Sequence, residues 1–267
     1  MNNICFFKRV LLISFVSLFI LSINAQTGSY EPASGQPGKD VVWVPTSQLL
    51  VDKMLDMAKV NPGDYLMDLG SGDGRLVITA AQRGATAVGI EYNPEMVKLS
   101  QKKAAEAGVS NKAKFMEADL FKTDLSKANV VTLFLLTNLN MQLRPSLLKL
   151  KPGTRIVSNT FNMGDWEPDA QETINDCGSG FCTALLWIVP ADVQGTWKTD
   201  QGKLVLEQKY QKFSGTLNGE KISDGHLNGS EISFKVKKDS YKGTVVGDKI
   251  QGSVVAEKGT REWTASF

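Results

Sequence analysis

Apolar and polar positions alternate with two different periodicities along the chain, one before residue 190 and one after it. In the first region, short apolar runs alternate with segments whose apolar residues recur every three or four positions. The apolar runs predict strands over residues 64–70, 86–93, 113–121, 129–137 and 154–161. The helical spacing predicts helices over residues 44–60, 75–85, 94–109 and 143–153. Residues 172–177 and 182–190 then predict a closing hairpin, which gives an α/β fold with seven strands in a mostly parallel sheet.

After Pro190 the helical spacing disappears and the chain alternates with a period of two residues. Ile232, Phe234 and Val236, for example, are separated by single polar residues. The turn dipeptides NG, DG and GD recur at short intervals. Residues 191–267 therefore predict about eight short strands in a small all-β barrel or sandwich domain. Such a domain binds an apolar ligand, docks a partner or caps the first domain, and we favour binding or docking.

The first 25 residues have the pattern of a secretory signal peptide. Lys8 and Arg9 precede an apolar run of 14 residues, Val10 to Ile23, and Ala25 offers a small residue for cleavage. The run is short for a membrane-spanning helix, although an uncleaved anchor is the alternative. Either way, the body of the chain is predicted to be exported, to the periplasm or outside the cell. Residues 26–40, rich in Gly, Pro and Ser, predict a flexible linker before a domain at 41–190.

The composition of the chain argues against some classes of binding partner. The chain has 30 Lys and Arg against 28 Asp and Glu, a net charge of +2, and no run of basic residues, so a nucleic-acid partner is not expected. Once the signal peptide is removed, the two cysteines left are Cys177 and Cys182, on either side of a short glycine-containing loop. In an exported protein this pair favours a disulfide, with two buried free thiols as the alternative. No metal-ligand spacing is present, and His226, the single histidine, is expected at the surface.

A glycine-rich turn, Gly70 to Gly74, directly follows the first predicted strand and directly precedes a helix. Such turns bring the backbone close to a ligand at the helix start. The spacing differs from the dinucleotide fingerprint, because the third glycine comes one position early. Asp68 and Asp73 flank the turn, and two carboxylates there would repel a pyrophosphate but attract an ammonium or sulfonium group.

Two more carboxylates follow at the ends of the next strands. Glu91 ends the second strand, where a carboxylate accepts hydrogen bonds from ribose hydroxyls. Asp119 ends the third, where it accepts from the exocyclic amino group of an adenine, with Leu120 and Phe121 near the ring. The carboxyl ends of parallel strands meet at one edge of the sheet, so these groups are expected in one site.

Residues 41–190 resemble the class I S-adenosylmethionine-dependent methyltransferases, on the stretches "DLGSGDGR", "GIEYNPE" and "EADLF" in that order. With "VPTSQLLVDKML" and the region from "FLLTN" to "MGDWEPD", the chain is also similar to the mitochondrial protein-lysine methyltransferases of the ATP synthase c subunit and the adenine nucleotide translocase, and to their bacterial relatives. The resemblance implies a Rossmann-like methyltransferase fold and S-adenosyl-L-methionine as cofactor. It implies that Asp68, Gly70, Gly72 and Asp73 surround the methionine part, that Glu91 holds the ribose and that Asp119 holds the adenine. The full cofactor-binding set that we predict is Asp68, Gly70, Ser71, Gly72, Asp73, Gly74, Glu91, Tyr92, Asn93, Asp119 and Leu120.

The predicted acceptor side is less specific. Asn138, Asn159 and Thr160, at the ends of the fourth and fifth predicted strands, are expected to line a slot for an amine, and Trp43 and Phe161 to wall it. "FLLTN" lacks the Asn/Asp-Pro-Pro-aromatic stretch of many amino-group methyltransferases, which disfavours adenine or glutamine as acceptor. No catalytic general base is assigned.

The sequence thus predicts an exported methyltransferase that acts on an amine such as a protein lysine, or on a small amine. The alternative is an exported, non-catalytic nucleoside-binding protein whose β-rich domain binds a ligand or partner. A dinucleotide oxidoreductase is disfavoured by the early third glycine.

Overall fold

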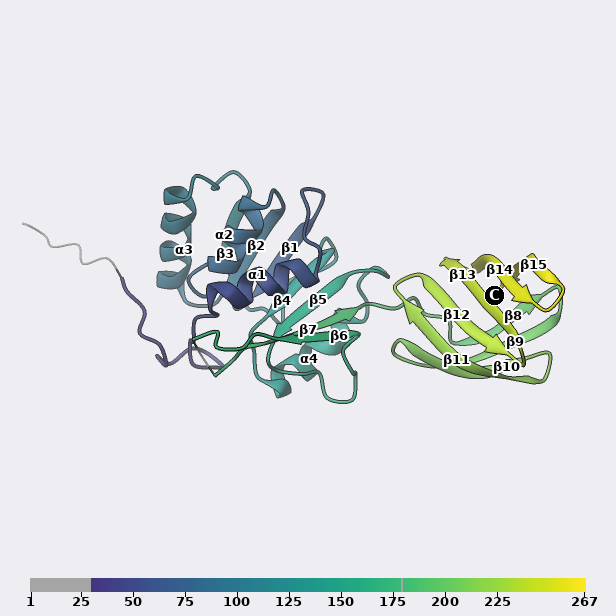
Figure 1. The fold of residues 1–267 in the computed structure, drawn as a ribbon. Coiled ribbons are helices and arrows are strands. Elements are labelled where there is room, and N and C mark those ends of the chain that lie inside the picture. The colour runs from purple at the N-terminus through teal and green to yellow at the C-terminus, as the bar shows by residue number, and fades with distance from the viewer. Residues whose placement is uncertain (1–29, 179) are drawn as a thin grey trace, which may run out of the picture. The chain divides into compact units, whose positions relative to one another are not determined.

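A seven-stranded sheet forms the first part of the fold, with strands in the order β3-β2-β1-β4-β5-β7-β6 (Figure 1). The computed structural model describes residues 30–178 and 180–267, of which residues 32–267 form one compact unit. The strands are β1 (Tyr65–Leu69), β2 (Thr86–Glu91), β3 (Ala113–Glu117), β4 (Val130–Leu133), β5 (Arg155–Asn159), β6 (Ala170–Thr173) and β7 (Thr183–Ile188). β1 to β5 run parallel, whereas β7 runs antiparallel to both β5 and β6. The carboxyl ends of β1 to β5 therefore share one edge of the sheet with the start of β7.

Four helices cover the sheet (Figure 1): α1 (Gln48–Met57), α2 (Arg75–Gln82), α3 (Pro94–Glu106) and α4 (Thr137–Leu147). Apolar residues of α1, α2 and α3 pack on one face of the sheet, and those of α4 pack on the other. Consecutive strand residues alternate between the two faces, as Leu66 and Met67 do. Burial on both faces explains why these strands read as continuous apolar runs in the sequence. The predicted α/β fold is confirmed.

The boundary between the fourth predicted strand and the helix after it is wrong. The sequence predicted a strand over residues 129–137 and a helix over residues 143–153, but β4 ends at Leu133 and α4 begins at Thr137. Pro145 lies inside this helix, near its end. The early start was hidden because the residue before the helix is Leu136, whose side chain makes no capping hydrogen bond. The helix predicted over residues 44–60 begins at Gln48, and Ser47 caps it, because its hydroxyl accepts from the Leu50 N–H at 3.3 Å.

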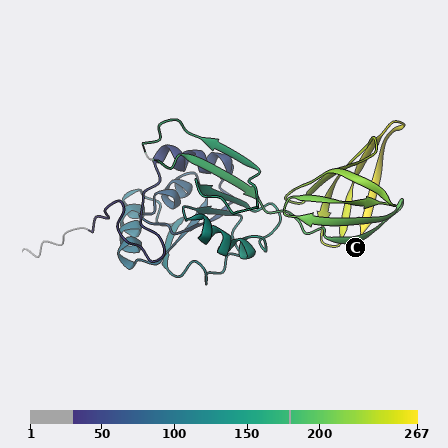
Figure 2. The same ribbon diagram turned by 90° about the horizontal axis from the view of Figure 1, so that it is seen from below.

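The second part of the fold is a closed antiparallel barrel of eight strands, which Figure 2 shows from below. Its strands are β8 (Gly195–Thr199), β9 (Gly202–Lys209), β10 (Lys212–Leu217), β11 (Glu220–Asn228), β12 (Glu231–Val236), β13 (Asp239–Val246), β14 (Lys249–Ala256) and β15 (Gly259–Ser266). Each strand pairs with the next, and β15 closes the ring on β8 through Ala265 with Thr199 and Ser266 with Lys198. Of the two predicted architectures, barrel and sandwich, the barrel is correct.

The interior of the barrel is filled by side chains. Phe234 and Tyr241 stack with their ring centroids 4.7 Å apart, and Trp263 meets both rings edge-on. Trp197 fills another part of the same core and donates from its indole N–H to the Val193 carbonyl. A small barrel packed in this way leaves its interior to side chains, so the hypothesis of an apolar ligand inside it finds no support.

The predicted signal peptide, residues 1–25, lies outside the described residues, as do residues 26–29 of the predicted linker. Among the residues that are described, no helix is both long enough and apolar enough to span a membrane.

Candidate active site

A cavity of about 440 Å³ opens at the carboxyl edge of the parallel strands. Its floor comes from the glycine turn after β1 and from the ends of β2 and β4. Residues 36–46, which precede α1, line its other side. The predicted flexible linker is therefore wrong for residues 36–40, because they contribute to the wall of this cavity. Their Gly and Pro content resembles that of a linker, while the contacts that fix them come from residues far along the chain.

The glycine turn is shaped by contacts with its neighbours. Gly72 has a φ of +53°, and a Cβ there would lie 2.5 Å from Nε1 of Trp43. The predicted wall residue Trp43 thus lies directly on the turn, and glycine is needed for this approach. Gly74 differs from the prediction, because it is absent from the cavity lining. A Cβ on it would lie 2.8 Å from the ring of Phe115 and from Ser100, so this glycine allows α2 to pack closely on the neighbouring elements.

Asp68 is a buried carboxylate of the site. Its carboxylate accepts a hydrogen bond of 2.7 Å from the Thr132 hydroxyl on β4. Burial raises the pKa of Asp68 to about 7, despite that hydrogen bond. The nearby carboxylates Glu91 and Asp73 add to the rise. Within the described part of the chain, no lysine or arginine pairs with it. A buried carboxylate in this state gains most from a ligand that brings a positive charge.

Asp73, the other predicted carboxylate of the turn, already has cationic partners. Arg75 binds it through two nitrogens, with the Nη2 to Oδ2 distance at 2.8 Å, and Lys103 of α3 reaches Oδ2 at 2.7 Å. Burial raises the pKa of Asp73, but the hydrogen bonds from Arg75 and Lys103 outweigh burial and hold the pKa below its usual value. The sequence predicted that Asp68 and Asp73 together attract a cationic ligand. In the structure only Asp68 is available for this role, because Asp73 is paired with Arg75 and Lys103.

We expect binding of a cationic ligand to be linked to the titration of Asp68. Below pH 7 a proton competes with the ligand for this carboxylate, so each further unit of acidification should raise the dissociation constant up to about tenfold. Calorimetric titration with S-adenosylhomocysteine from pH 5.5 to 7.5, where the ligand's amino group remains protonated, measures this effect. An affinity that stays constant over the range would show that Asp68 does not contact a positive group.

Glu91, at the end of β2, organises the centre of the site. Its Oε2 accepts from the Gly72 N–H at 2.9 Å, and its Oε1 accepts from the Asn93 N–H at 2.9 Å. Each carboxylate oxygen keeps a second lone pair, so the same group is able to accept from two ribose hydroxyls. Tyr92 and Asn93 also line the cavity, and Asn93 caps α3 by accepting from the Glu95 N–H.

Asp119 and Leu120, the residues predicted to hold the adenine, both line the cavity. The Oδ1 of Asp119 accepts from the Phe121 N–H at 3.0 Å. Lys39, from the segment before α1, donates to Oδ2 at 2.9 Å and lies 4.7 Å from the centre of the Tyr92 ring. The hydrogen bond from Lys39, then that from Phe121, lowers the pKa of Asp119. An adenine amino group would share this carboxylate with Lys39, a contact that the sequence did not predict.

The predicted acceptor residues divide into two groups. Trp43 and Phe161 line the cavity, as expected. Asn159 and Thr160 do not: Asn159 is buried and donates to the Thr46 hydroxyl at 3.2 Å, and Thr160 donates back to Asn159 at 2.9 Å. Both therefore hold the end of β5 in place behind the cavity wall.

Asn138 is the clearest error on this side. It is exposed on α4, because β4 ends earlier than predicted. Asn140, two residues later, is the buried asparagine, and its amide donates to the carbonyl of Phe161 at 3.0 Å.

The cavity-related residues that sequence reasoning missed include Lys39, Thr132, Phe134 and Phe181. Thr132 carried a signal, since it is the polar residue in an otherwise apolar strand. Phe181 carried another, since it is a large apolar residue in the loop between the two cysteines. The sulfur atoms of Cys177 and Cys182 are bonded, so the predicted disulfide is confirmed. The described residues contain no cluster of His, Cys, Asp and Glu side chains placed to hold a metal ion.

Comparisons with known proteins find methyltransferases similar to this chain. The family model described as the ANTKMT methyltransferase domain matches residues 68–170. A protein-lysine N-methyltransferase of Saccharolobus islandicus (strain REY15A) is 41% identical over 152 residues, which cover 56% of this chain and 94% of that protein. The lysine N-methyltransferase of the ATP synthase c subunit from Homo sapiens is 37% identical over 48% of this chain and 54% of its own length. This chain thus spans nearly all of the Saccharolobus islandicus relative and about half of the human one.

A solved structure is similar over the same region. The crystal structure of an RNA methyltransferase from Salinibacter ruber, in complex with S-adenosyl-L-homocysteine, aligns with a TM-score of 0.53 and 46% identity. The alignment covers 56% of this chain and 96% of that one. The similar proteins named here are all methyltransferases, which gives no support to the hypothesis of a non-catalytic nucleoside-binding protein.

Proposed function

The chain belongs to the family of S-adenosylmethionine-dependent protein-lysine N-methyltransferases, and we propose that it methylates the side-chain amine of lysine in a protein substrate. Two relatives with that printed activity, one of them matched over nearly its whole length, support the proposal. The observation in the structure that supports it most is Asp68, a buried carboxylate without a cationic partner among the described residues, at the end of β1.

The residues of the site fit S-adenosylmethionine. Asp68 offers a negative charge to the ammonium group of the methionine part, and Gly70 and Gly72 of the turn after β1 line the same cavity. Glu91 offers its remaining lone pairs to the ribose, and Asp119 offers an acceptor to the adenine amino group. Ser71 fits as well, because its buried hydroxyl has no hydrogen-bond partner in the described structure. When bound, S-adenosylmethionine supplies an activated methyl group on a sulfonium.

The chain's own contribution is to prepare the acceptor amine. A lysine amine attacks only without its proton, and an apolar surrounding lowers the pKa of an amine because it disfavours the charged form. Phe134, Phe161 and Leu139 supply such a surrounding in the cavity. Holding the amine in line with the methyl group then accelerates the transfer chiefly by positioning. The products are a methylated amine and S-adenosylhomocysteine, and the amine's proton leaves to solvent.

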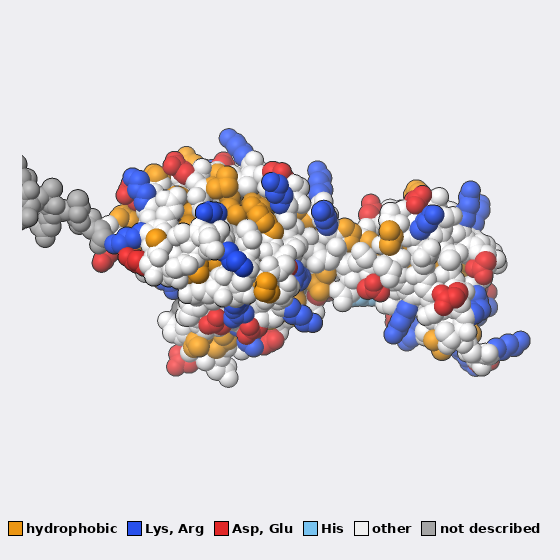
Figure 3. Space-filling model, turned by 90° about the horizontal axis from the view of Figure 1, so that it is seen from above, with side chains coloured by type: hydrophobic (Ala, Val, Ile, Leu, Met, Phe, Trp, Pro, Cys, Tyr) orange, Lys and Arg blue, Asp and Glu red, His pale blue; other side chains and the backbone are white. Residues whose placement is uncertain are grey.

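RNA is the second acceptor class to consider, because the Salinibacter ruber structure is of an RNA methyltransferase. Binding to a phosphate backbone requires a concentrated positive surface. On the face in Figure 3, positive and negative side chains are interspersed, and the net charge of the chain is only +2. Charge therefore favours a protein acceptor over RNA.

We also propose that residues 1–25 are a signal peptide and that the protein works outside the cytoplasm. The support is the sequence pattern, together with the disulfide Cys177–Cys182, since disulfides persist in oxidising compartments. In this proposal, residues 41–190 are the methyltransferase domain and residues 191–267 a β-rich domain.

The decisive experiment is a labelling assay with S-adenosylmethionine that carries a tritiated methyl group. The purified chain is incubated with cytoplasmic proteins, exported proteins and total RNA of its own organism, each in a separate reaction. We expect protease-sensitive label that elutes as methylated lysine after acid hydrolysis, and only background label with an Asp68→Asn variant. Label that is removed by ribonuclease, or the absence of any label together with the absence of S-adenosylmethionine binding, would overturn the proposal.

A further inference from the structure

Phe181 reaches the active-site cavity from an unexpected direction. It lies in the loop between β6 and β7, two residues before β7 begins. Because β7 runs antiparallel to β5, its first residues lie beside the carboxyl end of β5, at the ligand-binding edge. The Thr183 carbonyl accepts from the Thr160 N–H at 2.7 Å and fixes the two chains side by side there. The reversed strand thus delivers a side chain that no parallel strand of the sheet supplies.

At this edge three phenyl rings lie together on the cavity wall. The ring centroid of Phe181 is 5.3 Å from that of Phe134 and 5.8 Å from that of Phe161, and the latter two are 6.1 Å apart. All three residues line the cavity. They come from the end of β4, the end of β5 and the loop before β7, so three separate segments converge to form one aromatic wall.

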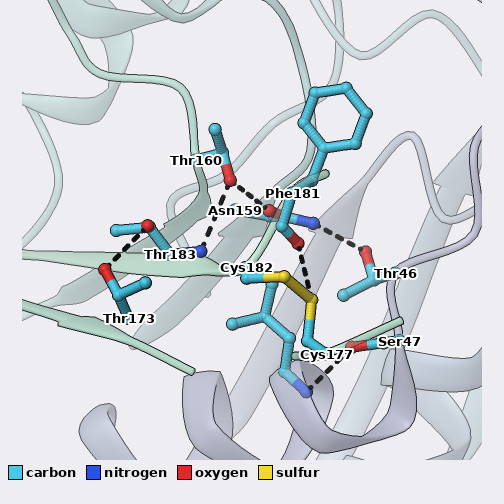
Figure 4. Close-up of a disulfide and its surroundings, with 10 residues drawn as sticks. Thr46, Ser47, Asn159, Thr160, Thr173, Cys177, Phe181, Cys182 and Thr183 are labelled. Atoms are coloured by element: carbon cyan, nitrogen blue, oxygen red, sulfur yellow. Dashed lines mark hydrogen bonds between the residues drawn. A yellow bond between two sulfur atoms is a disulfide. The ribbon is translucent and has the colours of Figure 1, made fainter. Parts of the chain in front are cut away.

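The disulfide closes the loop that carries Phe181. Cys177 and Cys182 are bonded with their Cα atoms 5.7 Å apart, and Phe181 is the residue next to Cys182. Figure 4 shows the ring of Phe181 pointing away from the disulfide, while Cys182 leads into β7. Cys177 is only 4% exposed. The crosslink therefore restricts the conformations open to the backbone on both sides of Phe181.

The backbone around Phe161 is also fixed by specific contacts. Thr160, before it, has a φ of +61°, which is unfavourable for a β-branched residue. The backbone hydrogen bond to Thr183 and the bond from the Asn140 amide to the Phe161 carbonyl keep it there. Strained backbone retained beside a cavity is typical of functional positions.

We propose that Phe134, Phe161 and Phe181 form the wall of the channel through which the acceptor amine enters, and that the Cys177–Cys182 disulfide positions Phe181 in this wall. The inference rests on the proposed function. It gives these residues a role in binding the acceptor amine and none in binding S-adenosylmethionine. Phenyl faces attract ammonium and methylammonium groups, and the apolar wall excludes water from the amine. S-adenosylmethionine, at the glycine turn and the ends of β1 to β3, would bind without this wall.

The test uses two ligands and needs no knowledge of the protein substrate. The first is S-adenosylhomocysteine. The second is a bisubstrate analogue in which the sulfur of S-adenosylhomocysteine is replaced by a nitrogen that carries, through a two-carbon bridge, a lysine side chain. Calorimetry gives the ratio of the two affinities, which reports the contribution of the acceptor channel alone. The proteins compared are the oxidised wild type, the wild type reduced with a phosphine, Phe181→Ala, Phe181→Tyr and the double variant Cys177→Ser/Cys182→Ser.

We expect the oxidised wild type to bind the analogue at least tenfold more tightly than S-adenosylhomocysteine. Phe181→Ala, reduction and the double variant should each remove most of this advantage, while the affinity for S-adenosylhomocysteine changes less than threefold. Phe181→Tyr, which keeps the ring, should retain the advantage, and the phosphine should have no effect on the double variant.

Three results would overturn the proposal. An advantage that survives Phe181→Ala would remove Phe181 from the channel. An advantage lost in Phe181→Ala but kept after reduction and in the double variant would remove the role of the disulfide. If S-adenosylhomocysteine itself does not bind to the oxidised wild type, the proposed function fails, and this inference fails with it for a recognisably different reason.

Discussion

Replacing Asp68 by asparagine is expected to weaken the binding of S-adenosylmethionine about a hundredfold and, at the same time, to stabilise the ligand-free protein. Binding suffers because the buried negative charge that meets the ligand's ammonium group is lost, and a buried charged contact is worth about 2–3 kcal/mol. The asparagine oxygen can still accept from the Thr132 hydroxyl, so the local hydrogen bond is kept.

The stabilising effect follows from the direction of the pKa shift. The folded protein holds the Asp68 proton more tightly than the unfolded chain, because the pKa rises from 3.8 to about 7 on folding. Stability is therefore lost as the pH rises from about 4 to about 7, and the whole loss, on the order of 4 kcal/mol, is present above pH 7. An asparagine side chain does not titrate, so the free energy of unfolding of the variant does not fall in this way as the pH rises.

Thermal denaturation of the ligand-free wild type and Asp68→Asn at pH 5 and pH 8 measures this effect. The variant should gain most at pH 8 and less than half as much at pH 5. Asp248→Asn, an exposed carboxylate of the barrel, is the matched control and should stay within about 0.5 kcal/mol at both. A variant destabilised at pH 8 would contradict the view that Asp68 is an unpaired buried charge.

Replacing Glu91 by alanine should have the same effect on binding but the opposite effect on stability. The carboxylate accepts from the Gly72 and Asn93 N–H groups, and hydrogen bonds to a charged group are worth about 1.5–3 kcal/mol each before solvent exposure reduces them. We expect the variant to lose about 2 kcal/mol of stability and to bind S-adenosylmethionine about a hundredfold more weakly, because the ribose loses its acceptor as well.

Glu95→Ala is the control for this variant. Glu95 lies in the first turn of α3 and forms an exposed ion pair with Lys98, outside the cavity lining. Its removal should alter stability by less than about 1 kcal/mol and leave ligand affinity unchanged. Should Glu91→Ala bind S-adenosylmethionine as tightly as Glu95→Ala does, Glu91 would have only a structural role in the turn.

The cofactor side of the cavity was predictable because its information is local. Asp68, the glycine turn and Glu91 stand in fixed positions relative to strand ends, and the apolar runs mark those ends clearly. The topology then brings the ends together, since parallel neighbours share one edge. The same reasoning gave the hairpin β6–β7, and with it the pairing of Cys177 with Cys182.

The acceptor side was less predictable because its geometry depends on contacts between distant residues. Asn138 and Asn140 look alike in sequence, and only the point at which β4 ends decides which one is buried. Gly74 looks like part of the ligand-binding turn until the ring of Phe115 is placed against it. Lys39 pairs with Asp119 across 80 positions of sequence, which no local pattern reveals.

The barrel's closure has a consequence for the order in which it folds. From β8 to β15 every pairing joins neighbours in sequence except the last, between β15 and β8. The hairpins can form one after another as the chain becomes available, with little loop entropy to overcome. The ring cannot close until Ala265 and Ser266 have emerged to meet Lys198 and Thr199. During synthesis the half-made barrel therefore exposes the edge of β8 as a template for other strands, and this exposure ends only when its final strand arrives.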